Sequence, residues 1–224
     1  MADNNTTTGR RHPKRIPYGM MNFVAVRRDG CYYVDKTRFV EEVELSNKFF
    51  FYIRPRRFGK SLTLSMLQHY YDVNDADKFD MLYKGLYIGD HPTPERNSYL
   101  VIKLNFAVVN AELNNYRKAL DAHCNIEFNY FCDVYSQYLP KGMKEKLNEK
   151  DGAVDQLNYI YTECKKAGQK IYLFIDEYDH FTNQILANQA HEGKYRHKPM
   201  VRAICASFLI PSRVRRLLVW VVSL

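Results

Sequence analysis

Two groups of polar residues have the types and spacing that suit phosphate chemistry. The first is Gly59-Lys60-Ser61, which follows the apolar run 49–53 and precedes apolar residues at helical spacing. In a tight loop between a strand and a helix, the backbone N–H groups at the helix start point towards an anion. Lys60 would then reach the β- and γ-phosphates of a nucleotide, and the Ser61 hydroxyl would bind Mg²⁺.

The second group is Asp176-Glu177, at the end of the apolar run 171–175. A continuous apolar run is typical of a central parallel strand, and ligands bind beyond the carboxyl ends of such strands. Asp176 would hold Mg²⁺, directly or through water, and Glu177 would orient and deprotonate an attacking water. The two groups therefore indicate Walker A and Walker B motifs, with catalytic roles for Lys60 and Glu177 and metal binding by Ser61 and Asp176.

The loop before the helix departs from the P-loop pattern G-x-x-x-x-G-K-[ST] at its first position, which is Arg54. A bulky residue is compatible with that position only where the backbone does not need a positive φ. In turn, the three arginines of the loop and Lys60 would place four positive charges beside a triphosphate. The residues predicted to bind the nucleotide are Arg54, Arg56, Arg57, Phe58, Gly59, Lys60, Ser61 and Leu62.

The apolar segments around these motifs predict an α/β fold. Adjacent Asp-Glu is typical of P-loop ATPases in which an extra strand lies between the two motif strands. Residues 99–106 are a candidate for another parallel strand of the same sheet, and residues 217–222 can form a further apolar strand. We expect a P-loop NTPase with a mostly parallel sheet flanked by helices, of the additional-strand, catalytic-glutamate type. A short strand at 31–34, a helix over 36–43 capped by Asp35 and an exposed charged stretch at 141–151 are also predicted.

Composition places limits on the class of protein. A chain of 224 residues with 46% hydrophobic residues can bury a core, and we expect a basic, disordered tail at 1–15 and one domain at 16–224. The net charge of +8 suits a polyanion, although surplus Lys and Arg also serve solubility. The start of the chain has no signal-peptide core, no segment is long enough to span a membrane, and the five cysteines lack zinc spacing. These features predict a cytoplasmic protein.

Four motifs together resemble the bacterial AAA-ATPase-like family: R-P-R-R-F-G-K-S, Y-V-D-K-T, G-L-Y-I-G and I-D-E-Y-D. The resemblance runs from about residue 16 to about residue 181, and arginine at position 54 is the family's usual form. It implies an ATP-binding P-loop domain that uses ATP and Mg²⁺. Longer members carry a C-terminal PD-(D/E)XK nuclease-like domain. The resemblance weakens after about residue 190, which predicts a chain truncated at its C-terminus and leaves the arginine finger and sensor residues unassigned.

Several functions stay open at this point. The first is an ATPase that uses water as the acceptor. The second is a regulatory or binding module that responds to nucleotide without turnover, and the third is a nucleic-acid-associated protein that uses the positive charge. Nucleic acid or another protein is a candidate partner besides ATP, and the oligomeric state is open. The Y-V-D-K-T segment at 33–37 suits either contact with the nucleotide base or ordinary capping and packing.

Overall fold

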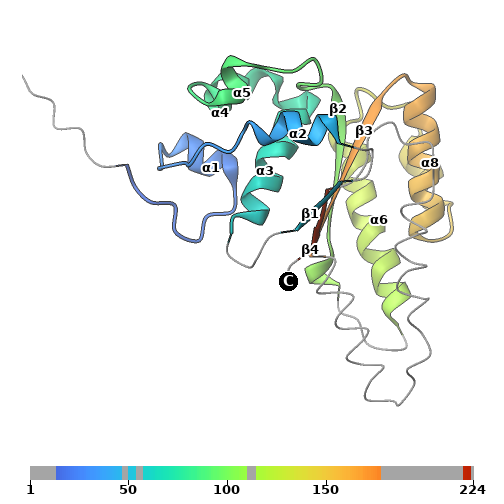
Figure 1. The fold of residues 1–224 in the computed structure, drawn as a ribbon. Coiled ribbons are helices and arrows are strands. Elements are labelled where there is room, and N and C mark those ends of the chain that lie inside the picture. Colours follow the sequence, from blue (N-terminus) through green and yellow to red (C-terminus); the bar gives the residue numbers. More distant parts are fainter. Residues whose placement is uncertain (1–13, 47–49, 54–57, 110–114, 178–218, 223–224) are drawn as a thin grey trace, which may run out of the picture.

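The structure is a computed structural model that describes residues 14–46, 50–53, 58–109, 115–177 and 219–222. Within these residues, four parallel strands form one sheet (Figure 1). The strands are β1 (Phe50–Ile53), β2 (Tyr99–Asn105), β3 (Lys170–Asp176) and β4 (Val219–Val222). Their order is β1-β4-β3-β2, so β4 lies between the two strands that carry the motifs.

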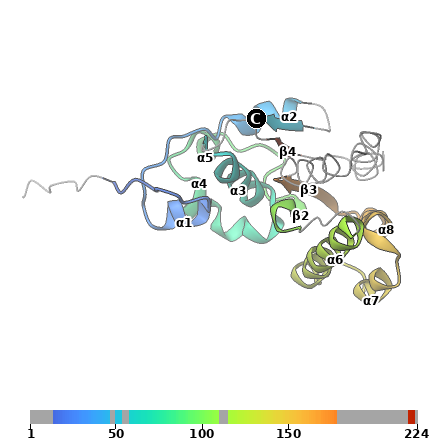
Figure 2. The ribbon, with the colours of Figure 1, turned by 90° about the horizontal axis from the view of Figure 1, so that it is seen from below.

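Helices cover both faces of this sheet (Figures 1 and 2). The elements on the first face are α1 (Phe23–Arg28), α2 (Phe39–Leu45), α3 (Lys60–Tyr71), α4 (Phe79–Tyr83) and α5 (Tyr87–Asp90), with the 3₁₀ helix η1 (Val73–Lys78) between α3 and α4. On the second face are α6 (Tyr116–Val134), α7 (Met143–Asn148) and α8 (Gly152–Lys166). A further 3₁₀ helix, η2 (Phe106–Val108), follows β2.

Strands β2 and β3 are buried on both sides because their side chains alternate between two hydrophobic clusters. In β3, Leu173 and Ile175 pack with α6, α7 and α8, whereas Tyr172 and Phe174 pack with the helices of the first face. Burial on both faces explains why β2 and β3 read as nearly continuous apolar runs in the sequence.

Two predictions for residues 31–43 differ from the structure, one in the kind of element and one in where a helix begins. Residues 31–34 form no strand, since Tyr32 donates one backbone hydrogen bond to Arg15 and no ladder follows in the described part of the chain. Helix α2 begins at Phe39 rather than at residue 36. The reason is that the Asp35 carboxylate accepts hydrogen bonds from the N–H and hydroxyl of Thr37, which stabilises a turn before the helix.

The stretch 141–151 is also more ordered than predicted. It contains α7, and Met143 and Leu147 on this short helix are buried in the cluster with α6 and α8. An apolar pair at i and i+4 lies on one side of a helix, so two residues are enough to anchor it among charged neighbours. None of the helices that the structure describes is both long and apolar enough to cross a membrane.

Candidate functional site

The start of α3 is formed by Gly59 and Lys60. Gly59 is the N-cap residue with φ 75° and ψ 23°, in the left-handed region that glycine adopts without a Cβ clash. Its carbonyl accepts hydrogen bonds from the Thr63 N–H at 2.9 Å and the Thr63 hydroxyl at 3.0 Å. The first N–H groups of a helix have no partner within the helix, so the start of α3 offers donors to an anion.

Lys60 places a buried positive charge at this helix start. Its side chain is only 9% exposed, and its Nζ atom lies 3.5 Å from Oε1 of Glu177. Nζ is buried and donates no hydrogen bond to any described residue. A buried ammonium group is costly unless an opposite charge and hydrogen-bond acceptors compensate it. Lys60 therefore meets one requirement for binding an anion, a charged donor with unused hydrogen-bonding capacity.

Asp176 and Glu177 supply the opposing charges at the carboxyl end of β3. Asp176 is buried, and its Oδ1 atom accepts a hydrogen bond from the Glu177 N–H at 2.9 Å. Burial first, and the negative charge of Glu177 second, raise the pKa of Asp176 above its ordinary value, while Lys60 acts in the opposite direction. Glu177 has φ 56°, a left-handed conformation that is uncommon for residues other than glycine.

The fold explains why these three residues meet. Asp176 is on the same side of β3 as Tyr172 and Phe174, which pack against α3. In the parallel register, Asn105 of β2 stands beside Asp176, and Lys103 is on the same side of β2. The charge of Lys103 also lowers the pKa of Asp176, as a smaller effect than burial. Sequence reasoning did not assign these two residues to the site; their only signal is that they interrupt an apolar strand.

The other predicted site residues precede Gly59 or follow Lys60 in the chain. Ser61 and Leu62 are partly buried in the first turn of α3, where Leu62 packs against the apolar cluster. Phe58 is 60% exposed. The predicted phosphate-binding arginines, Arg54, Arg56 and Arg57, lie outside the described residues.

In the described part of the chain, the candidate site does not include a ready-made cluster of metal ligands. Among the described residues, no group of three or more His, Cys, Asp or Glu side chains could hold a metal ion. A Ser61 hydroxyl with an Asp176 carboxylate would be a smaller set, of the kind that binds Mg²⁺ together with substrate phosphates and waters. Magnesium binding by these two residues therefore stays a prediction.

The Y-V-D-K-T and G-L-Y-I-G motifs are connected to each other by hydrogen bonds. The Asp35 carboxylate accepts a hydrogen bond from the Tyr87 N–H at 2.7 Å, and the Thr37 hydroxyl accepts one from the Ile88 N–H at 3.1 Å. Gly89 has no room for a side chain, because an added Cβ would lie 2.1 Å from the carbonyl oxygen of Tyr83. These contacts account for both motifs by capping and packing. A base contact from residues 33–37 stays a prediction.

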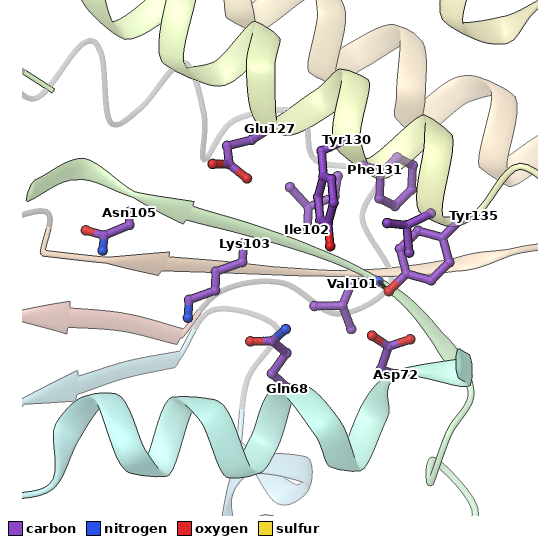
Figure 3. Close-up of a pocket in the computed structure, with 11 residues that line it drawn as sticks. Gln68, Asp72, Val101, Ile102, Lys103, Asn105, Glu127, Tyr130, Phe131 and Tyr135 are labelled. Carbon is purple, nitrogen blue, oxygen red and sulfur yellow. Dashed lines mark hydrogen bonds between the residues drawn. The ribbon is translucent and has the colours of Figure 1, made fainter. Parts of the chain in front are cut away.

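A separate cavity of about 300 Å³ lies along β2, between α3 and α6 (Figure 3). Its walls include Gln68 of α3, Lys103 of β2 and Tyr130 of α6. The residues that line it do not include Lys60, Asp176 or Glu177. Lys103 and Asn105 line this cavity and also lie on the side of β2 that adjoins the candidate site. The cavity is therefore a neighbour of the site and not part of it.

The parallel sheet with helices on both faces is compatible with the α/β fold of AAA-type ATPases. The chain belongs to the AAA-ATPase-like family, described as "Predicted AAA-ATPase", whose model matches residues 17–214. Membership indicates a nucleotide-binding, ATPase-like domain.

One curated relative is an uncharacterized protein in the vnfD 5′ region of Azotobacter chroococcum mcd 1. It is 38% identical over 78 residues, which are 34% of this chain and 14% of that protein. The matched region is thus a small part of the relative's length. No solved structure matches the chain significantly.

Proposed function

We propose that this protein is a Mg²⁺-dependent ATPase that binds ATP at the start of α3 and uses water as the phosphoryl acceptor. The observation that carries this proposal is the buried Nζ of Lys60, which begins α3, has no hydrogen-bond acceptor among the described residues and faces the acids at the end of β3. Family membership supports the nucleotide class of the ligand.

Each residue has a separate task in the proposed reaction. Lys60 and the N–H groups at the start of α3 hold the phosphates, with Arg54, Arg56, Arg57 and the neighbouring Phe58, Gly59 and Leu62 completing the binding loop. Ser61 and Asp176 would hold Mg²⁺, which neutralises charge on the phosphate oxygens when it is bound.

Glu177 completes the set as the general base. Its carboxylate accepts a proton from water while the water oxygen bonds to the γ-phosphorus. The bond from that phosphorus to the bridging oxygen of ADP breaks, so the products are ADP and inorganic phosphate. The Glu177 side chain is 33% exposed, so water can reach it.

Replacing Lys60 tests the binding half of the proposal. Lys60→Ala should weaken ATP affinity on the order of 100-fold, because it removes a buried charge from the phosphate contacts. Isothermal titration calorimetry measures the affinity. The matched control is Lys144→Ala, because Lys144 pairs with Asp133 on the opposite face of the sheet. Unchanged affinity in a folded Lys60→Ala variant would place the nucleotide elsewhere.

The Lys60–Glu177 ion pair favours a second candidate, a nucleotide-dependent module without turnover. In this structure the proposed base is engaged by a lysine instead of being free to act on water. A measurement of phosphate release from ATP distinguishes the two functions. Steady release that Glu177→Gln removes supports the ATPase, and tight binding without release supports the module.

A further inference from the structure

Lys60 and Glu177, which have catalytic roles in the proposed function, are paired with each other in this structure. The Nζ and Oε1 atoms are 3.5 Å apart, and the Lys60 side chain is nearly buried. Because Nζ has no hydrogen-bond acceptor among the described residues, the charge of Glu177 is a principal compensation for this ammonium group. The carboxylate of Glu177 is thus in contact with the group proposed to bind phosphate.

The backbone holds Glu177 in this arrangement. Its φ of 56° lies in the left-handed region, and the Asp176 carboxylate stabilises that conformation by accepting the Glu177 N–H. Non-glycine residues in this region cluster at functional sites and are held there by their surroundings. A change of φ at this one residue would move the carboxylate away from Lys60.

The charges make phosphate and Glu177 competitors. Asp176 and Glu177 bring two carboxylates near Lys60, and Lys103 is a further positive charge with a weaker effect on Asp176. A triphosphate that contacts Lys60 would add further negative charge beside these carboxylates, and like charges at short range repel. The Lys60 ammonium group has donors for more than one acceptor, but its charge is already compensated by Glu177, so phosphate gains the full attraction of Lys60 only when Glu177 moves away.

We propose that Glu177 is an internal competitor of the nucleotide: its carboxylate pairs with Lys60 until phosphate displaces it. This inference rests on the proposed function, because it assigns the same two residues. The new element is that the Glu177 carboxylate lowers the affinity for nucleotide. This carboxylate becomes free to act as a base only when the nucleotide binds. Nucleotide binding and activation of the base are then linked. One conformation of Glu177 favours its own contact with Lys60, and the other favours contact between Lys60 and phosphate.

Glu177→Gln tests this inference, because glutamine has the same shape without the charge. We expect its affinity for a non-hydrolysable ATP analogue, and for inorganic triphosphate, to rise roughly fivefold to tenfold in calorimetry at low salt. The analogue excludes an apparent gain caused by lost turnover. Glu163→Gln is the matched control, since Glu163 pairs with Lys166 on α8 and should leave affinity unchanged.

The double variant Lys60→Ala/Glu177→Gln identifies the source of the gain. If Glu177 competes for Lys60, the gain disappears in the Lys60→Ala background, whereas simple repulsion of phosphate by Glu177 would persist there and overturn the inference. Unchanged or weaker affinity in Glu177→Gln would also overturn it. In either case, loss of binding in Lys60→Ala alone would leave the proposed ATP site standing. Full binding in Lys60→Ala would overturn both.

Discussion

Asp176 is a buried carboxylate that the folded protein holds in an unfavourable environment. Its raised pKa shows that burial and the nearby charge of Glu177 outweigh the attraction of Lys60. Carboxylates of this kind are common at functional sites, where the cost to stability is retained because the charge serves binding or catalysis. The proposed magnesium site would provide that use.

Asp176→Asn should separate stability from function. We expect the free energy of unfolding without Mg²⁺ to rise by about 1 kcal/mol, because the buried charge is removed while the amide oxygen can still accept the Glu177 N–H. The Mg²⁺-dependent part of ATP affinity should be lost. Urea unfolding and calorimetry with and without Mg²⁺ measure these quantities. Asp133→Asn is the control, and a less stable Asp176→Asn variant would contradict the argument.

At the scale of elements, Asp35 connects the turn before α2 to the start of α5. Its carboxylate accepts the N–H and hydroxyl of Thr37 and the N–H of Tyr87. Asp35→Ala should lower the free energy of unfolding by about 1–2 kcal/mol, because hydrogen bonds to a charged acceptor are lost. Asp29→Ala, at an exposed pair with Arg28, should have little effect.

The contribution of Asp35 should also depend on pH. Burial opposes its ionisation, but the hydrogen bonds from Thr37 and Tyr87 outweigh burial and lower its pKa below the ordinary value of 3.8. A carboxylate with a lowered pKa stabilises the fold above its unfolded-state pKa and loses that contribution as the pH falls through the folded value. The difference between wild type and Asp35→Ala should therefore be constant near neutral pH and shrink below about pH 4. A difference that grows in acid would contradict this assignment.

At the scale of the molecule, Tyr135 joins the two helical layers at the edge of the sheet formed by β2. Tyr135 directly follows α6, and its hydroxyl accepts the Val101 N–H at 3.1 Å. It lies beside Asp72 at the end of α3, and after burial the charge of this carboxylate further raises the pKa of Tyr135 (Figure 3). The two layers are therefore connected by a buried polar link as well as by the apolar core.

Tyr135→Phe tests this link. We expect the free energy of unfolding to fall by about 1–3 kcal/mol, because the buried Val101 N–H loses its hydrogen-bond acceptor. Tyr130→Phe is the matched control, since Tyr130 lines the same cavity and is 65% exposed. Its effect should stay within about 0.5 kcal/mol in the same urea titration. Equal effects of the two substitutions would contradict the role of the Tyr135 hydroxyl.

Local patterns predicted the strands better than the short helices. The runs that became β2 and β3 could be recognised because a parallel strand covered on both faces is apolar at nearly every position. The start of α2 was missed because the Asp35 side chain bonds Thr37 in a turn, a choice that its contact with Tyr87 also supports. Helix α7 was missed because only Met143 and Leu147 distinguish it from an exposed charged segment.

Local sequence patterns were enough to predict that a glycine and Lys60 begin a helix after an apolar run and that Asp176-Glu177 end another apolar run. Both follow from local chemistry, the conformational freedom of glycine and the burial of apolar strands. No local pattern could predict that Lys60 contacts Glu177, that Glu177 has a left-handed backbone or that Asn105 stands beside Asp176. Those facts depend on strand order, register and the face on which α3 packs, which are set by contacts between residues far apart in the chain.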